Sequence, residues 1–426
     1  MRLWSYTFMI QQLISYVTLI LLLFSIDFLI FIRTKKLLIW KSNRKVANGV
    51  WWSTCLLAYL CIFLSFFFQW SNYVTAWLTF IPITFTLGKL MAVPLIAFDL
   101  LLSIFKKNKL LLIKTNTSIN KNLPLISRSD FLIKSGIFIG GTTMMPMIYG
   151  FKSNLYNYQV KNIDLVLPNL PTSLDGIKIA QISDIHAGSF FNKKAVENGV
   201  NLILAEKPDL IFFTGDLVND FAHEMNDYLS IFSKLKAPLG TFSILGNHDY
   251  GDYHFNRFHF FEKNKITKQQ NLVAIKEIHK TLGWQLLLNE SKTILVNKEE
   301  IVIIGVENWG ANNALNYGDL AKAMMNVKDS TAIKLLLSHD PSHWKAEVVP
   351  NFPNIDVTFS GHTHGGQYGI DIPGYHWSPI QYKYKEWSGL YREKQQQLYV
   401  NAGFGYLDYP SRVGILPEIT IFHLKR

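Results

Sequence analysis

Cysteine is scarce in this sequence, because its 426 residues include only Cys55 and Cys61. Both lie in one apolar stretch, and a spacing of six residues places them on different faces of a helix, which argues against a disulfide between them. Two cysteines are too few for a disulfide scaffold or for a metal site built from cysteine ligands. The sequence excludes both of these classes.

Acidic residues are nearly absent from the first third of the chain. Residues 1–150 contain 15 Lys or Arg but only Asp27, Asp99 and Asp130, and the first glutamate is Glu197. The rest of the chain has 27 basic and 28 acidic residues, so the net charge of +11 belongs to the apolar first part. Positive charge beside apolar segments is typical of membrane topology. It is not the distribution of a nucleic-acid-binding surface, and we expect no nucleic-acid partner.

Four stretches are long and apolar enough to cross a bilayer as helices, which takes about 20 residues. They cover roughly residues 10–32, 50–69, 73–105 and 132–151. The third is too long for one straight span and short for two, and Pro82 and Pro94 lie inside it, so we interpret it as one kinked helix. The sequence therefore predicts an all-α transmembrane domain of about four helices (residues 1–151), followed by a second domain (residues 152–426).

Basic residues predict the orientation of these spans. Two connecting segments carry them: Arg33, Lys35, Lys36, Lys41, Arg44 and Lys45 follow the first span, and Lys106, Lys107, Lys109, Lys114, Lys121, Arg128 and Lys134 lie around the link to the fourth. Both segments should face the cytoplasm. We thus expect a multi-pass protein of a bacterial cell (inner) membrane with an extracytoplasmic second domain. Two spans in the third stretch would instead place that domain in the cytoplasm.

Three charged residues lie inside apolar segments, namely Asp27, Lys89 and Asp99. Charge is costly there and often functional. A structural ion pair within the helix bundle is the simpler interpretation, and a transport or proton-relay role is the alternative.

Beyond residue 151, short apolar runs alternate with polar and helical stretches, which indicates an α/β domain. Five of these runs are followed directly by Asp, Asn or His. Ile177–Ile182 precedes Asp184 and His186, Leu210–Phe213 precedes Asp216, Thr241–Leu245 precedes Asn247, His248 and Asp249, Ile333–Leu337 precedes His339, and Ile355–Phe359 precedes His362 and His364. Sites in open α/β sheets gather beyond the carboxyl ends of strands, so we expect these side chains to converge in one cleft.

The residue types in these five groups favour a divalent metal. Asp, Asn and His supply oxygen and nitrogen ligands suited to Zn, Fe or Mn. Side chains two apart on an extended strand end point the same way, so Asp184 and His186 can reach one ion, as can His362 and His364. Glycine beside each group lets the backbone approach an ion or a phosphate closely. Each group alone is weak evidence, whereas five in succession predict a metal site.

Taken in order, the motifs Asp-x-His, Gly-Asp, Gly-Asn-His-Asp, a lone His and Gly-His-x-His resemble the signature of the calcineurin-like metallophosphoesterase family. The resemblance covers roughly residues 160–426, includes Arg412, and extends to a layout similar to transmembrane proteins with a metallophosphoesterase domain. It implies a four-layer α/β/β/α sandwich around two mixed sheets. It also implies two divalent ions (Mn, Zn, Fe or Mg), one held by Asp184, His186, Asp216 and His364 and the other by Asp216, Asn247, His339 and His362.

Such a site implies hydrolysis of a phosphomonoester, a phosphodiester or a pyrophosphate. Two cations bind a phosphate oxygen and lower the pKa of a shared water, and the resulting hydroxide attacks phosphorus. His248 is then available to contact phosphate or to protonate the leaving oxygen, and Asp249 either orients His248 or is structural. The membrane anchor makes a lipid-linked phosphate an attractive substrate. The alternative function is a non-enzymatic membrane sensor or transporter that retains a metal-binding domain.

The remaining histidines lie outside these motifs. They are His223, His254, His259, His279, His343, His376 and His423. We expect most of them to be exposed or structural, with His254 and His376 as candidates to line a substrate cleft. The aromatic stretch Tyr250–Phe261 is a candidate lid or membrane-contacting loop, and an ordinary packed hairpin is the alternative.

Overall fold

The computed structural model describes residues 2–35, 43–67, 72–109, 127–255, 266–311, 315–328 and 331–426. These residues separate into two compact units, of which the first ends at Tyr149 and the second begins at Gly150. Four of the basic residues used to predict topology, Lys36, Lys41, Lys114 and Lys121, lie outside the described residues. The orientation in the membrane therefore stays a prediction.

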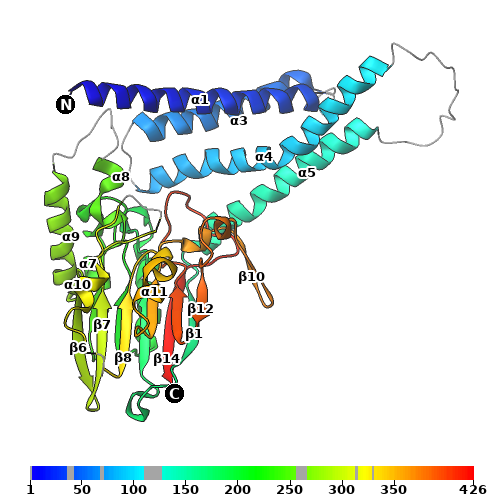
Figure 1. The fold of residues 1–426 in the computed structure, drawn as a ribbon. Helices are drawn as coiled ribbons and strands as arrows, with labels where there is room; N and C mark the ends of the chain where they lie inside the picture. The colour runs from blue at the N-terminus through cyan, green and yellow to red at the C-terminus, as the bar shows by residue number, and fades with distance from the viewer. Residues whose placement is uncertain are drawn as a thin grey trace. The chain divides into compact units, whose positions relative to one another are not determined.

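The first unit consists of four long helices (Figure 1). They are α1 (Arg2–Thr34), α3 (Arg44–Phe67), α4 (Asn72–Lys109) and α5 (Arg128–Tyr149). The stretches able to cross a membrane are Val17–Thr34, Arg44–Ser65, Tyr73–Phe105 and Arg128–Asn154, which confirms the expected four spans. The third stretch forms one helix, and α4 bends along its length in Figure 1. Two prolines inside it, Pro82 and Pro94, each remove a helical hydrogen bond and so permit the bend.

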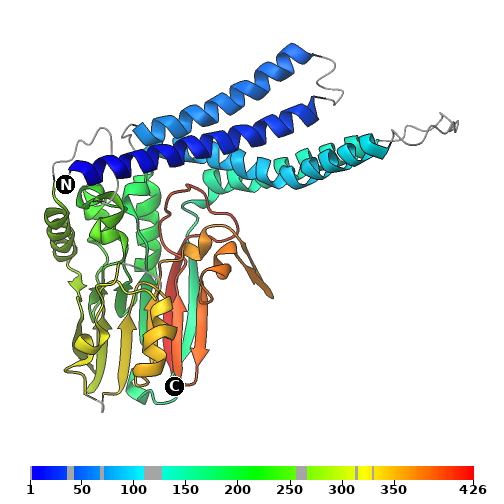
Figure 2. The same cartoon turned by 45° about the horizontal axis from the view of Figure 1, so that its top comes forward.

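Helices α4 and α5 lie side by side in Figures 1 and 2. Glycine makes this approach possible, because a Cβ added at Gly140 would overlap the backbone carbonyl oxygen of Gly88. Small residues that let two helix backbones come close are a common means of helix association in membranes. On α3, Cys55 and Cys61 are both free, in agreement with their spacing.

The charged residues inside the apolar segments, Asp27, Lys89 and Asp99, are paired. Lys89 Nζ lies 2.6 Å from Asp27 Oδ1, and the Tyr59 hydroxyl donates to the same carboxylate. Arg33 Nη2 lies 2.7 Å from Asp99 Oδ2. Both carboxylates are buried, and a buried charge persists at low cost only when it has a partner of opposite charge. This arrangement matches the structural interpretation of these charges.

The second unit contains two six-stranded mixed sheets and a separate hairpin. In spatial order the first sheet is β1 (Gln159–Val166), β14 (Glu418–Lys425), β2 (Lys178–Ile182), β3 (Leu210–Phe213), β4 (Thr241–Ser243) and β5 (Gln285–Leu286). The second is β12 (Gly389–Glu393), β13 (Gln396–Val400), β9 (Val357–Ser360), β8 (Ile333–Leu337), β7 (Glu299–Gly305) and β6 (Glu290–Val296). The hairpin pairs β10 (Ile370–Ile372) with β11 (Tyr375–Trp377).

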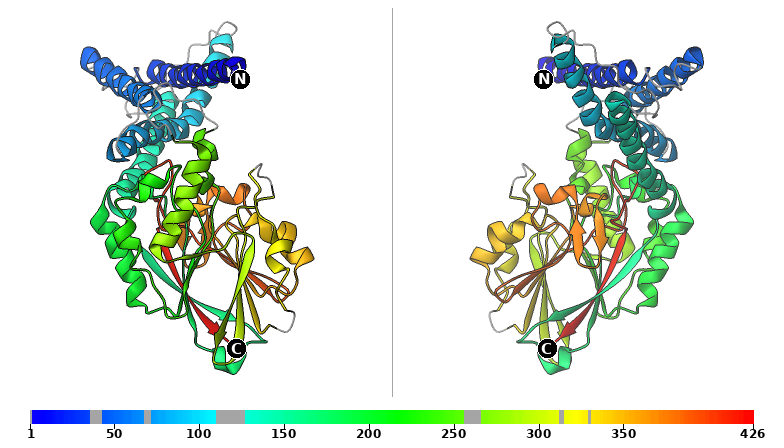
Figure 3. Two further views of the ribbon diagram at one scale, coloured as in Figure 1. Left: turned by 90° about the vertical axis from the view of Figure 1, so that its left-hand side faces the viewer. Right: turned by 90° about the vertical axis from the view of Figure 1, so that its right-hand side faces the viewer.

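Helices cover the outer faces of both sheets, which gives four layers (Figure 3). The α-helices of this unit are α6 (Lys193–Ala205), α7 (Leu229–Phe232), α8 (Asp252–Phe255), α9 (Lys268–Leu282), α10 (Leu320–Met324) and α11 (Val349–Asn351), of which α8 lies beyond the strand ends (Figure 1). Side chains alternate between the two faces of each strand. On β3, Phe213 packs toward the helices α6, α7 and α9, whereas Phe212 packs between the sheets against Phe359 of β9. On the far side, Leu336 of β8 packs with Trp344. The predicted four-layer sandwich is confirmed.

The strand register places the functional loops at one edge of each sheet. Strands β2, β3 and β4 are parallel, with Ile182 beside Phe213 and Ile211 beside Thr241. In the other sheet β8 and β9 are parallel, with Leu337 beside Phe359. Because their carboxyl ends are level, the segments that leave these strands emerge close together.

Candidate metal centre

The first of two clusters of potential metal ligands contains Asp184, His186 and His364. One ligand atom of each lies within 4.8 Å of the others, and all three side chains are buried. The Nε2 atoms of His186 and His364 face each other at 3.1 Å. Asn219 Oδ1 lies 3.1 Å from His186 Nδ1 and accepts its hydrogen, which leaves Nε2 with a lone pair for a cation.

The second cluster contains Asp216, His339 and His362, again within 4.8 Å of one another. His339 Nδ1 donates to the backbone oxygen of Thr214 at 2.7 Å, so its Nε2 faces the cluster. Asn247 was the fourth ligand expected here. Its Nδ2 donates to the Tyr253 hydroxyl at 3.1 Å, while its Oδ1 is buried and has no hydrogen-bond partner among the described residues. A buried acceptor without a partner is costly, and a cation would satisfy it.

Asp216 lies between the two clusters. Its Oδ2 atom is 3.0 Å from His339 Nε2 and 3.5 Å from His186 Nε2. Its other oxygen, Oδ1, accepts the backbone N–H of His248 at 2.9 Å. One carboxylate thus faces ligands of both clusters, as the position expected to bridge two ions requires.

Five of the predicted ligands have backbones in the left-handed region. The φ angles are 52° for Asp184, 48° for His186, 61° for Asp216, 71° for His362 and 50° for His364. Residues other than glycine rarely adopt this conformation, at a cost of about 1–2 kcal/mol each, and such strain concentrates at functional sites. The expectation that the paired ligands share an extended strand end is therefore corrected. Asp184 and His186 still reach one cluster, because the chain turns sharply after β2. After β9, His362 and His364 divide between the two clusters, so the expectation that these two reach one ion is wrong.

Two glycines allow the loops to approach the carboxylates. A Cβ added at Gly246 would overlap the carboxylate of Asp216, and one at Gly361 would overlap that of Asp184. Only glycine fits either position without a shift of the site. The expected role of glycine, close backbone approach, is met at these two places.

The site concentrates charge away from water. Burial lowers the pKa of His186 to about 3 and that of His362 to about 4, so both rings are neutral, as a metal ligand must be. Burial alone would lower the pKa of His339, but the negative charge of Asp216 raises it to about 10. Burial, with repulsion from Asp216, raises the pKa of Asp184 to about 6. Two carboxylates buried together favour a cation between them.

Asp249 does not orient His248, and that expectation is corrected. Its carboxylate accepts the backbone N–H groups of Gly246 at 2.9 Å, Asp216 at 3.0 Å and Leu217 at 2.8 Å. These contacts hold the loops after β3 and β4 together. The geometry agrees with the alternative interpretation of Asp249 as a structural residue.

The backbone carbonyl of Asn219 orients His248 instead. His248 Nδ1 lies 2.8 Å from that oxygen and donates to it. The His248 ring also meets that of His186 edge-on, with ring centroids 4.9 Å apart. Asn219 therefore contacts two histidines of the site, one through its side chain and one through its backbone. Sequence reasoning missed Asn219, although it lies only three residues after Asp216.

Two family models match the chain. Residues 177–366 match calcineurin-like phosphoesterases, and residues 11–155 match the probable transmembrane domain of calcineurin-like phosphoesterases. The chain belongs to the calcineurin-like phosphoesterase family. Both the metal-ligand clusters and the four long helices lie largely within the matched ranges.

Relatives of this calcineurin-like phosphoesterase occur in bacteria and animals. The uncharacterized metallophosphoesterase YkuE of Bacillus subtilis is 29% identical over 70% of this chain and 98% of its own length. A transmembrane protein with metallophosphoesterase domain from Danio rerio is 26% identical over 67% of this chain and 61% of its own. The phosphodiesterase YaeI of Escherichia coli is 28% identical over 58% of this chain and 82% of its own.

Three further residues of the phosphoesterase domain support the ligands and were not predicted in these roles. Tyr253 fixes the amide of Asn247, as described above. The Tyr384 hydroxyl lies 2.8 Å from His362 Nε2. Arg412 is fully buried, which lowers its pKa to about 10, and its Nη2 donates to the backbone oxygen of Ala402 at 2.9 Å. Only Arg412 had a sequence signal, through the family resemblance.

The other histidines agree in part with their expected roles. His279 is buried and pairs with Ser243 Oγ at 2.9 Å, so it is structural. His376 is exposed and stacks on Trp387 with ring centroids 4.0 Å apart, which places it outside the metal centre. The His254 side chain and all of His259 lie outside the described residues. Of the stretch Tyr250–Phe261, the described part ends in helix α8, and its role as a lid stays a prediction.

Proposed function

We propose that this chain is a membrane-anchored two-metal phosphoesterase that hydrolyses a phosphomonoester, a phosphodiester or a pyrophosphate. The observation that carries the proposal is the carboxylate of Asp216, whose Oδ2 lies within 3.5 Å of a histidine in each cluster. The ligands would be Asp184, His186, Asp216 and His364 for one ion, and Asp216, Asn247, His339 and His362 for the other. The unpartnered Oδ1 of Asn247 supports this assignment.

Two divalent ions at such a site would supply Lewis-acid activation of the phosphoryl group and of water. The chain itself holds the ligands in strained, pre-formed positions, so little rearrangement is needed on binding. His248 is half-buried, and its Nδ1 is committed to Asn219. Its Nε2 is then available to contact a phosphate oxygen or to give a proton to the leaving oxygen.

The substrate and the location of the reaction are the finer parts of the proposal. The four helices that can cross a membrane support a substrate at or near a bilayer, such as a lipid-linked phosphate. The phosphodiesterase name of the Escherichia coli relative supports a diester. The distribution of basic residues supports an extracytoplasmic catalytic domain in the inner membrane of a bacterium.

The test uses the full chain purified in detergent. Hydrolysis of bis-p-nitrophenyl phosphate, p-nitrophenyl phosphate and a lipid diphosphate would be measured with Mn, Zn, Fe and Mg, and bound metal would be counted separately. We expect metal-dependent turnover that falls at least about a hundredfold in Asp216→Asn, since the bridging charge is lost. The matched control is Asp371→Asn, an exposed aspartate on β10. Activity that survives in Asp216→Asn, or no metal in the wild-type protein, would refute the proposal.

A further inference from the structure

A pocket opens beside the second cluster of ligands and has no role in the reaction so far described. Its volume is about 470 Å³, which lies in the range of small-molecule sites. His362 and Asp340 line it next to the metal centre, and Tyr253 and Tyr384 form its walls. All of these residues belong to the second unit. A substrate whose phosphate lies at the metal centre would extend its remaining groups into this space.

Lysine side chains bring positive charge to the pocket. Lys345, Lys383 and Lys385 line it, against the carboxylates of Asp340 and Glu386. Asp340 is committed to the protein, because it accepts the backbone N–H of Ser342 at 2.9 Å and lies 3.5 Å from His362 Nε2. The charge that a ligand would meet therefore comes mainly from lysines that have no carboxylate partner among the described residues.

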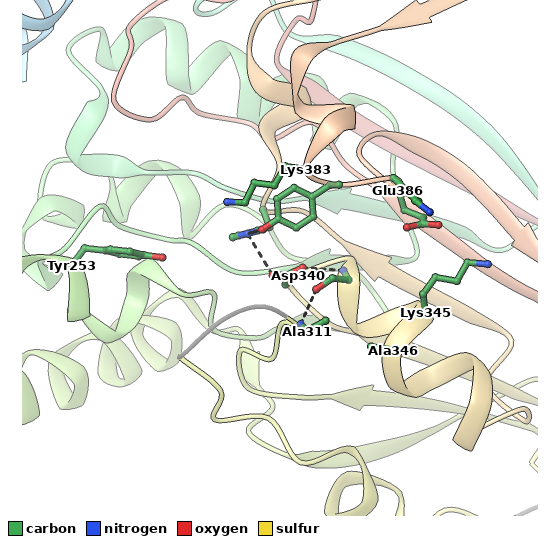
Figure 4. Close-up of a pocket in the computed structure, with 11 residues that line it drawn as sticks. Tyr253, Ala311, Asp340, Lys345, Ala346, Lys383 and Glu386 are labelled. Carbon is green, nitrogen blue, oxygen red and sulfur yellow. Dashed lines mark hydrogen bonds and ion pairs between the residues drawn. The ribbon is translucent and has the colours of Figure 1, made fainter. Parts of the chain in front are cut away.

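Two of these lysines, Lys345 and Lys383, differ in their partners. Lys345 forms an ion pair with Glu393, and in Figure 4 its side chain extends away from Tyr253, on the side of Glu386. Lys383 extends toward the side where Tyr253 enters the pocket (Figure 4) and forms no ion pair with any described residue. Its Nζ lies 5.2 Å from the centre of the Tyr384 ring, and the hydroxyl of that ring contacts His362. The Tyr384 ring thus lies between the ammonium of Lys383 and His362, which is a candidate metal ligand.

We propose that Lys383 binds a second anionic group of the substrate, so that the substrate class is a diphosphate or another phosphate whose leaving group is itself charged. The inference rests on the proposed function. In the reaction a water oxygen bonds to the terminal phosphorus, the bridging P–O bond breaks, and its electron pair stays on the departing phosphate. The two protons of the water pass to the products or to solvent. Lys383 is matched to the departing phosphate, whose charge grows as the bond breaks.

The experiment compares phenyl diphosphate with phenyl phosphate, which differ by one phosphate group, using the full chain in detergent with Mn. Phosphate release would be followed for the wild-type protein and for Lys383→Ala, Lys383→Arg and the paired-lysine control Lys345→Ala. We expect kcat/KM for the diphosphate to fall about tenfold in Lys383→Ala, with kcat/KM for phenyl phosphate changed less than about twofold. Lys383→Arg should restore most of the loss, and Lys345→Ala should resemble the wild type. Because Lys383 is exposed, added salt should reduce the wild-type preference for the diphosphate.

The outcomes separate the two proposals. Equal losses on both substrates in Lys383→Ala, or a wild-type protein that does not prefer the diphosphate, would overturn the role of Lys383 while leaving the phosphoesterase intact. If Lys345→Ala also lost the preference for the diphosphate, that preference would come from the charge of the whole pocket. The specific role of Lys383 would then be overturned. Absence of turnover on either substrate with both metals bound would overturn both proposals for phosphates of this size.

Discussion

Tyr253→Phe tests whether a side chain outside the predicted ligand set controls metal binding. The change removes one oxygen atom, which accepts a hydrogen bond of 3.1 Å from Asn247 Nδ2. That hydrogen bond holds the amide so that Oδ1, not Nδ2, faces the second cluster. A neutral hydrogen bond contributes about 0.5–1.5 kcal/mol, which corresponds to about a two- to tenfold change in an equilibrium constant. Loss of a group that orients a ligand reaches about 10–100-fold in metal affinity. We therefore expect the affinity of one metal site to fall between about threefold and thirtyfold.

Titration of the metal-free protein with Mn measures this directly, by following the signal of free Mn in paramagnetic resonance. One of two affinities should weaken while the other, which depends on Asp184, His186 and His364, stays the same. The matched control is Tyr158→Phe, because the Tyr158 hydroxyl is buried and has no hydrogen-bond partner among the described residues. Unchanged affinities in Tyr253→Phe, or an equal loss in Tyr158→Phe, would refute the orienting role.

Three more predictions follow from buried polar groups. Asp249→Ala removes the carboxylate that accepts hydrogen bonds from several buried backbone N–H groups, so it should lower the free energy of unfolding by at least about 3 kcal/mol, measured with urea. If Asp249 only oriented His248, the same change would leave the stability unchanged. Burial lowers the pKa of His279 to about 3, below its usual 6.5, so the unfolded state binds the extra proton and stability falls as pH drops through that window. In the absence of metal, the free energy of unfolding of the wild-type protein should fall below pH 6.5 by up to about 1.4 kcal/mol per pH unit more than that of His279→Gln. Parallel plots of stability against pH for the two proteins would contradict this. Lys89→Met leaves the charge of Asp27 unpaired and should lower the thermal stability in detergent by about 3–5 kcal/mol, with recovery on adding Asp27→Asn.

The strands that carry the site could be predicted because their signal is local. Leu210–Phe213 and Ile333–Leu337 form strands with the same limits that the apolar runs have in the sequence. Each is buried on both faces, which requires an unbroken apolar run, and each ends where a polar residue begins. The position of ligands after successive strands followed from the general behaviour of parallel sheets.

Two of the supporting residues, Tyr384 and Arg412, could not be assigned their contacts from the sequence, because their partners are distant in the chain. The Tyr384 hydroxyl contacts His362, which lies 22 residues earlier in the sequence. Arg412 contacts Ala402 and His364, which lie 10 and 48 residues earlier. No local spacing encodes such contacts. The contacts of the Asp249 carboxylate could not be predicted for a related reason, because the backbone N–H groups that donate to it come from two different loops.

The paired charges of the first unit also bear on the rival function, a sensor or transporter. A relay needs a charged group that can exchange its partner or meet water, whereas Asp27 and Asp99 are 1% and 0% exposed and each faces a cation. Two neutral pairs suit a bundle held in one arrangement. If the helices only anchor the enzyme, the double variant Asp27→Asn with Lys89→Met should keep wild-type turnover in detergent, because it removes both charges together. A sensor that acts through this pair requires the opposite: the same variant would change turnover or its response to a ligand while the metal centre stays fully occupied.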